Sequence, residues 1–233
     1  MNNKLITIPL EDVFPAAERY FLSTAGLNRE NEKHMRMWKQ ALEIYEEIRK
    51  KAEIKVLIHY LIPEKADGRD LYFHDVKISC NAFERVGLDN VNGAYFYLIT
   101  AGEAQTDSEQ VIHQLYGDIW GTSLVDAARE MIREKIAFID RDKDENSILS
   151  DSFGPGYYGM GLLQTADIFQ IIDASLVNVT LNPGGMMRPQ KSITGLFLSV
   201  KNADVLPPAT CESCIGGSSG CAFCNRWEGP ARF

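Results

Sequence analysis

Ser152-Phe-Gly-Pro-Gly-Tyr-Tyr-Gly-Met160 opens the most informative stretch of this 233-residue chain. The stretch runs on through a helix-like segment to Met186-Met-Arg-Pro-Gln-Lys-Ser-Ile-Thr-Gly195 and ends at Ser199. Its glycines at 154, 156, 159 and 161 allow positive φ and a close approach of the backbone to a ligand. Helices and strands rarely hold so many glycines, so we expect either a plain surface turn or a binding loop. In a binding loop, turned backbone N–H groups can hold a carboxylate.

Periodic patterns on both sides of this stretch predict a mixture of helices and strands. The expected helices cover residues 12–22, 28–52, 110–138 and 162–174, with a kink or break at Gly121 in the third. The expected strands cover residues 5–10, 55–62, 71–79, 94–100, 177–181 and 193–200. Because helices and strands do not strictly alternate, we expect an α+β fold with a largely antiparallel sheet.

Composition and charge limit the classes of function. The chain is 45% hydrophobic, enough for a substantial core, and its length fits one large domain or one domain with an appendage. A formal net charge of −8 argues against nucleic acid or an anionic membrane as a partner, since both favour a basic face. The first residues lack the apolar segment of a signal peptide, and no apolar run could span a bilayer. We therefore expect a cytoplasmic protein.

Four of the five cysteines lie close together near the C-terminus in the pattern Cys-x2-Cys-x6-Cys-x2-Cys. They are Cys211, Cys214, Cys221 and Cys224. Four thiolates suit a [4Fe–4S] cluster or structural zinc, and glycines before the second pair let the connector fold back. Zinc ribbons usually have a longer connector, which favours the iron–sulfur cluster. We expect a metal-binding tail over 206–233, attached to a domain over 1–205.

The acidic run Asp140-Arg-Asp-Lys-Asp-Glu-Asn146 partly resembles a calcium-binding loop. Its sixth position is Glu145, where the turn needs glycine, and its eighth is Ser147, where a branched apolar residue is usual. A solvated loop is therefore the better interpretation.

The order of motifs resembles the activation (reactivation) domain of cobalamin-dependent methionine synthase, especially its short stand-alone members. The matching motifs are Pro155-Gly156-Tyr157, the following helix, Val179-Thr180-Leu181, Met187 with Pro189, and Lys191-Ser192-Ile193-Thr194-Gly195. The resemblance implies one domain built on a long, twisted, largely antiparallel sheet with flanking helices.

The resemblance also implies a site for S-adenosylmethionine. In the family, the glycine loop binds this ligand and its tyrosine lies towards the cobalamin. Carried onto this chain, Gly156 and Tyr157 would line the site, with Gly154 in place of a small alanine. An acid on the preceding helix would meet the sulfonium or amino group. Asp126 is the candidate, and Glu130 lies one turn further along the same face.

Two positions depart from the family pattern. Ser152 stands where the family has an arginine that pairs with the carboxylate of the methionine moiety, and Val205 stands in place of a later tyrosine. A serine cannot make a bidentate charged pair, so binding would weaken by about 1.5–3 kcal/mol. Arg188 is a candidate substitute. Lys191 and Ser192 complete the predicted site and face either the ligand or solvent.

Two functions are compatible with the resemblance. The first is a stand-alone factor that docks on a separate corrinoid protein and caps the corrinoid with Tyr157. It would assist reductive remethylation of Co(II), with S-adenosylmethionine as methyl donor and the cysteine-bound metal relaying electrons from a reductase. The chain has no Asp-x-His-x-x-Gly motif, so the corrinoid would come on the partner.

The second function is a non-enzymatic adaptor or chaperone for a corrinoid protein, with a structural zinc tail. Ser152 and Val205 favour this version, because both remove a ligand contact. An unrelated methyltransferase is disfavoured, since the chain lacks the expected strand–Gly-x-Gly–helix order.

Overall fold

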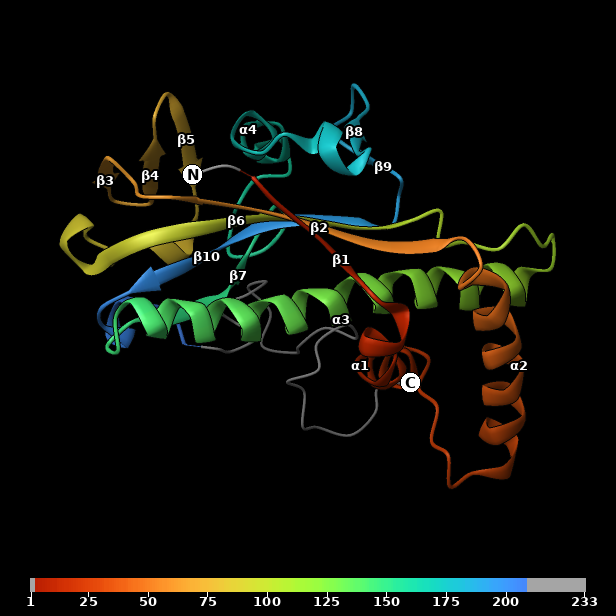
Figure 1. Cartoon of the computed structure of the whole chain (residues 1–233). Coiled ribbons are helices and arrows are strands. Elements are labelled where there is room, and N and C mark those ends of the chain that lie inside the picture. Colours follow the sequence, from red (N-terminus) through yellow and green to blue (C-terminus); the bar gives the residue numbers. More distant parts are fainter. Residues whose placement is uncertain (1–2, 209–233) are drawn as a thin grey trace.

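A five-stranded antiparallel sheet runs through the part of the chain that the computed structural model describes, residues 3–208 (Figure 1). The strand order is β1-β2-β6-β10-β7. These strands are β1 (Lys4–Ile8), β2 (Ala52–Leu61), β6 (Val91–Gly102), β10 (Ser192–Val200) and β7 (Ile148–Phe153). Every neighbouring pair is antiparallel. The α+β fold class with a large antiparallel sheet is therefore confirmed.

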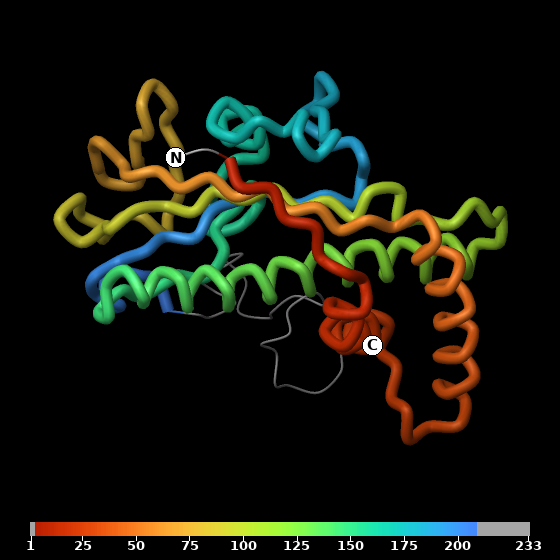
Figure 2. The backbone as a smooth tube through the Cα atoms, viewed as in Figure 1, coloured from red at the N-terminus to blue at the C-terminus, as the bar shows by residue number. Residues whose placement is uncertain are grey.

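Three helices cover one face of the sheet, and the longest runs along it beneath β6 and β10 (Figures 1 and 2). They are α1 (Leu10–Thr24), α2 (Glu32–Ile48) and α3 (Val111–Lys143). Their shared core centres on Trp120 of α3, whose ring stacks on Phe21 of α1 at a centroid distance of 4.3 Å. The Trp120 indole N–H donates to the carbonyl oxygen of Ala41 in α2 at 2.7 Å. One side chain thus joins all three helices.

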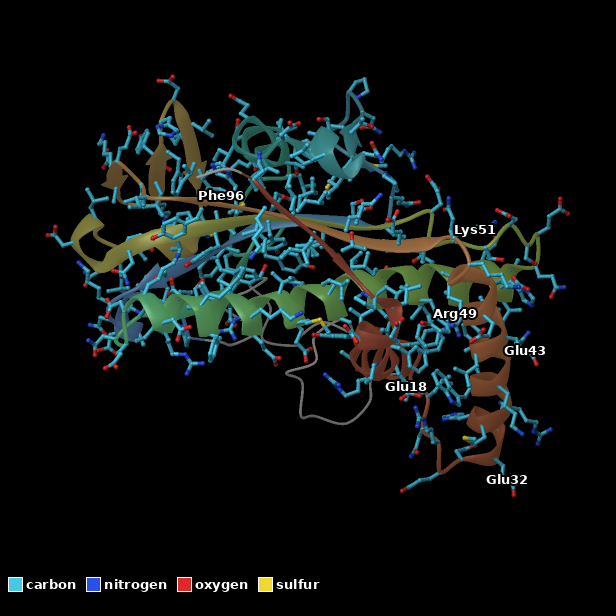
Figure 3. All side chains as sticks on the ribbon, in the orientation of Figure 1. Glu18, Glu32, Glu43, Arg49, Lys51 and Phe96 are labelled. Atoms are coloured by element: carbon cyan, nitrogen blue, oxygen red, sulfur yellow. The ribbon has the colours of Figure 1, made fainter. Side chains whose placement is uncertain are left out.

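Smaller elements cover the opposite face (Figure 1). They are the small sheet of β3 (Lys65–Asp67), β4 (Asp70–Phe73) and β5 (Val76–Ser79), the helix α4 (Gln164–Ile171), and the pair β8 (Thr180–Leu181) and β9 (Met187–Arg188). The core of this face includes Phe96 of β6, labelled in Figure 3, whose ring meets the edge of Phe73 at 4.9 Å. The sheet is therefore buried on both sides, which explains the continuous apolar run in β6.

The charged residues of α2 face away from the core, as the helical pattern predicts. Glu32 and Glu43 lie on the outer side in Figure 3, while Trp38 and Ile48 are buried. The helix begins at Glu32, not at the expected residue 28, because the Asn31 side chain accepts from two backbone N–H groups there.

Gly121 does not kink or break the long helix, contrary to the prediction; α3 continues without interruption to Lys143. A Cβ at Gly121 would lie 2.6 Å from the carbonyl oxygen of Ala104 and 2.7 Å from Cγ of Lys191. The glycine is needed because backbone and side chain approach the helix closely at this point.

The structure divides one expected strand, shortens another and adds a strand that was not expected. The strand over 71–79 is divided into β4 and β5 because His74 adopts a left-handed φ of 53° at the turn between them. The strand over 177–181 is reduced to β8, since its first residue belongs to a 3-10 turn (Ala174–Val177). The edge strand β7 was not predicted at all. Further 3-10 turns cover Asn81–Phe83, Leu88–Asn90 and Ala203–Val205.

The acidic run over 140–146 is not a wholly solvated loop, because its first residues form the last turn of α3. Asp140 is buried there, and its carboxylate accepts hydrogen bonds from the hydroxyls of Tyr95 at 2.7 Å, Ser199 at 2.6 Å and Ser147. This carboxylate fastens the C-terminal end of α3 to β6 and β10.

Within residues 3–208, no helix has the length and apolarity needed to cross a membrane.

Candidate functional site

The glycine loop leaves the edge strand β7 and closes on itself through backbone hydrogen bonds. The N–H of Gly156 donates to the carbonyl of Met160 at 2.9 Å, and the N–H of Tyr157 donates to Gly154 at 3.0 Å. The N–H of Met160 donates back to Tyr157 at 2.9 Å. These three N–H groups are used inside the loop and are therefore not available to a ligand.

The two tyrosines of the loop have different surroundings. Tyr157 is 40% exposed, whereas Tyr158 is buried and packs edge-on against Phe153 at 5.0 Å. The carbonyl of Tyr158 accepts from the Asn81 N–H at 2.8 Å and from the thiol of Cys80 at 3.4 Å. Burial raises the pKa of this thiol to about 12. Tyr158 therefore anchors the loop to the small sheet, and Tyr157 is presented at the surface.

Gly159→Ala should loosen this anchor and destabilise the domain by about 2–4 kcal/mol. Gly159 has φ of 73°, and a Cβ there would lie 2.3 Å from Nδ2 of Asn81. Asn81 cannot move away freely, because Arg69 donates to its Oδ1 at 3.0 Å. The loss is measured by urea denaturation.

Gly185→Ala is the matched control for this variant. Gly185 has φ of 77° but no atom within 4 Å of the added Cβ, so it isolates the cost of the left-handed conformation. That cost is about 1–2 kcal/mol. Equal losses in the two variants would show that the contact between Gly159 and Asn81 does not hold the loop.

Ser152 lies on the helix-covered side of the sheet, just before the loop. Its Oγ is 2.5 Å from the hydroxyl of Tyr97, which comes from β6, two strands away. Tyr97 reaches across β10 because its paired residue there is Gly195, where a Cβ would lie 2.8 Å from the Tyr97 hydroxyl. The glycine in β10 thus makes room for a phenol beside position 152.

Arg129, in the middle of α3, lies near Tyr97 and Ser152. The sequence patterns did not identify this residue. Its guanidinium pairs with Asp126 at 2.9 Å, and the two side chains are 26% and 19% exposed. Burial lowers the pKa of Arg129, but Asp126 and the phenols of Tyr97, Tyr20 and Tyr157 raise it, and the net direction is upward. Arg129 is therefore a fixed positive charge beside the loop.

The neighbouring carboxylate of Asp126 responds to the same surroundings. Burial raises the pKa of Asp126 above its ordinary range, and the charge of Arg129 partly opposes this shift. Glu130, the alternative acid, is engaged on the α1 side, where it pairs with Arg19 at 2.7 Å and accepts from Tyr20 at 2.8 Å. Of the two acids, Asp126 is therefore the one that pairs with Arg129, with which Tyr97 and Tyr157 also interact.

Lys191 and Ser192 lie further along the helix. Lys191 is 9% exposed in its side chain, and its ammonium pairs with Asp118 at 2.5 Å. Ser192 donates to the hydroxyl of Thr100 at 2.9 Å. Asp118 precedes Asp126 by eight residues, about 12 Å along a helix axis. The structure therefore does not bring these two predicted residues to the charged pair.

Arg188, the candidate substitute for the missing arginine, is exposed on β9. The β8–β9 pair lies on the α4 side of the sheet, whereas Asp126 belongs to α3 on the other side (Figure 1). The sheet separates Arg188 from the charged pair. Val205 ends a 3-10 turn near the last described residue.

The predicted metal ligands Cys211, Cys214, Cys221 and Cys224 lie outside the described residues. Within residues 3–208, no group of three or more histidine, cysteine or acidic side chains is arranged to hold a metal ion.

The described site therefore combines a paired cation and anion with phenol hydroxyls and an exposed tyrosine, at the edge of the sheet. A guanidinium recognises a carboxylate, and a carboxylate recognises an ammonium or sulfonium group. This arrangement suits a small ligand that carries both charges.

A solved structure with the same architecture gives these features a context. The crystal structure of the MetH reactivation domain bound to AdoHcy (S-adenosylhomocysteine) matches with a TM-score of 0.63, over 87% of this chain and 80% of that chain. The chain shares the fold of the MetH reactivation domain. The two sequences are 16% identical, so the likeness concerns the fold alone. No protein-family model and no curated protein sequence matches the chain.

The reactivation-domain fold was expected from the motifs in 152–199, and this expectation is confirmed. Arg129 was missed because Tyr97, which interacts with it, and Ser152, which contacts Tyr97, are distant in sequence. The available signal was its spacing of three residues from Asp126, which places both side chains on one helical face.

Proposed function

We propose that the chain is a stand-alone reactivation factor for a corrinoid protein. It would dock on a partner that carries the corrinoid, with Tyr157 over the corrinoid face and S-adenosylmethionine held beside the glycine loop. The observation that carries this proposal is the gathering of Asp126, Ser152 and Tyr157 at one edge of the sheet, in a fold shared with a domain bound to AdoHcy.

Remethylation of Co(II) requires a donor of one electron and a donor of the methyl group. A one-electron donor, which we propose to be a reductase, would reduce Co(II) of the partner's corrinoid to Co(I), and the tail thiolates would hold a metal that could relay this electron. The Co(I) of the partner would then attack the methyl carbon of the sulfonium, and the two electrons of the new Co–C bond would come from cobalt. The C–S bond electrons stay on sulfur, which leaves AdoHcy. The residues of this chain bind and orient the methyl donor and cover the corrinoid.

We also propose that the chain is divided into a ligand-binding domain over 1–205 and a metal-binding tail over 206–233. The thiolates of Cys211, Cys214, Cys221 and Cys224 fit a [4Fe–4S] cluster or zinc. Oxygen-free purification with iron, sulfide and zinc analysis tests this division. About four irons per chain and absorbance that bleaches with dithionite would favour an electron relay. One zinc without colour would make the tail structural.

Tyr157→Ala should weaken docking on the corrinoid by about tenfold, because an exposed aromatic ring would no longer cover it. The measurement is titration of a Co(II)-loaded cobalamin-binding fragment of methionine synthase, followed by the visible spectrum of the cobalt. Wild-type protein should change this spectrum with saturation. Tyr72→Ala, on the small sheet away from the loop, is the control and should behave as wild type.

An unchanged Co(II) spectrum with wild-type protein would contradict the docking role. The adaptor function remains the second candidate, favoured by the loss of charge at Ser152. A spectral change without any binding of AdoHcy would support the adaptor over the methyl-transfer role.

A further inference from the structure

We propose that Arg129 binds the carboxylate at the amino-acid end of the ligand, while Asp126 binds its amino group. The charge that is missing at position 152 would thus be supplied by α3 rather than by β7. This inference rests on the proposed function, because it concerns how the same site recognises an S-adenosylmethionine-type ligand.

The position of Arg129 relative to Ser152 is the first argument. The Tyr97 hydroxyl contacts Ser152 Oγ at 2.5 Å. Burial raises the pKa of Tyr97, and the nearby guanidinium of Arg129 lowers it. Tyr97 therefore contacts Ser152 and also interacts with Arg129. The positive charge of α3 is thus linked to position 152 through one phenol.

The donors of the guanidinium are the second argument. Arginine has five N–H donors in a planar fork, and its shortest contact with Asp126 is made by one terminal nitrogen, Nη2. The fork can therefore hold Asp126 and still present N–H groups to a carboxylate. The side chain is 26% exposed, so it keeps a route to a ligand while the low local dielectric strengthens the pairing.

The pairing with Asp126 is the third argument, because it matches a zwitterion. An α-amino acid carries a carboxylate and an ammonium group on the same carbon atom. A half-buried guanidinium and carboxylate joined at 2.9 Å offer the complementary charges side by side. The phenols of Tyr20, Tyr97 and Tyr157, which come from three separate parts of the chain, raise the pKa of the same guanidinium.

The opposing interpretation is that Arg129 and Asp126 only stabilise α3 as a pair three residues apart. The two interpretations differ in their response to ligands. AdoHcy carries the amino-acid end, whereas 5′-methylthioadenosine has the adenosyl group and lacks that end. A recognition role affects the first ligand alone, whereas a stabilising role affects both ligands or neither.

Calorimetric titration of the full chain with both ligands tests the inference. Arg129→Gln should weaken AdoHcy binding about tenfold to a hundredfold, and change 5′-methylthioadenosine binding by less than about twofold. Arg129→Lys keeps the charge and its attraction to Asp126 but loses the fork, so an intermediate loss is expected. Arg141→Gln, an exposed position on the same helix, is the matched control and should bind as wild type.

A rescue variant strengthens the test. Adding Ser152→Arg to Arg129→Gln returns a guanidinium to the neighbouring position in β7. This double variant should recover at least about tenfold of the lost AdoHcy affinity, since the charge is again next to the same phenol.

The outcomes separate the inference from the proposed function. If wild-type protein does not bind AdoHcy, the proposed methyl-donor site itself is overturned. If wild-type protein binds and both Arg129 variants bind equally well, the site stands and the role of Arg129 is overturned. Equal losses for AdoHcy and 5′-methylthioadenosine would likewise assign Arg129 to folding and overturn the inference.

Discussion

Replacing Trp120 with alanine should destabilise the domain by about 3–5 kcal/mol, the range for truncating a fully buried aromatic side chain. Trp120 is completely buried, and its ring contacts aromatic rings from both other helices of this face. The variant also removes the indole donor, so the carbonyl oxygen of Ala41 loses its partner at 2.7 Å. Cavity formation and the lost hydrogen bond act in the same direction.

Urea denaturation followed by far-ultraviolet circular dichroism measures this loss. Phe138→Ala is the matched control, since it removes an aromatic side chain from the same helix at a position that is 65% exposed. The control should change stability by less than about 0.5 kcal/mol. A Trp120→Ala loss below about 1.5 kcal/mol would mean that the three helices do not depend on this shared core.

Asp140→Ala should cost about 3 kcal/mol, because it leaves several buried hydroxyl groups without their acceptor. Asp140 accepts from Tyr95 at 2.7 Å and from Ser199 at 2.6 Å, and Ser147 donates to the same carboxylate. Each of these groups lies in the interior, where an unpaired polar group is costly. The variant should release the C-terminal end of α3 from β6 and β10.

Hydrogen exchange resolved along α3 locates this effect, and urea denaturation gives its size. Asp142→Ala, an exposed acid in the same helical turn, is the control and should leave both measurements nearly unchanged. Exchange that rises only near residue 140 and leaves the middle of the helix protected would confine the role of Asp140 to the helix end. Faster exchange that extends to Arg129 would show that this end also positions the charged pair.

The strands that could be predicted are those whose side chains carry a clear pattern. β2, β6 and β10 are rich in branched and aromatic residues and appear close to the predicted ranges. β7 has the sequence Ile-Leu-Ser-Asp-Ser-Phe, in which polar residues at the edge of the sheet replace the usual strand formers. Its place is set by pairing with β10, a long-range contact that no local pattern reports.

The candidate site could be predicted in part for a similar reason. The glycine loop stands out in the local sequence, and Asp126 was a candidate only through the family resemblance. Predicting Arg129 would have required knowing that the Tyr97 side chain lies across Gly195 and contacts Ser152. These three positions come together only in the folded sheet. The burial of Asp140 was hidden in the same way, since Tyr95 and Ser199 are distant in sequence.

Transfer of a labelled methyl group is the most direct test of the reactivation role. The chain would be mixed with S-adenosylmethionine labelled in its methyl group, a chemical one-electron donor, and the Co(II)-loaded cobalamin-binding fragment of methionine synthase. We expect the label to reach the corrinoid at a rate that depends on this chain and falls with Arg129→Gln. Label transfer at the same rate without the chain would contradict the proposed function, as would no transfer in its presence.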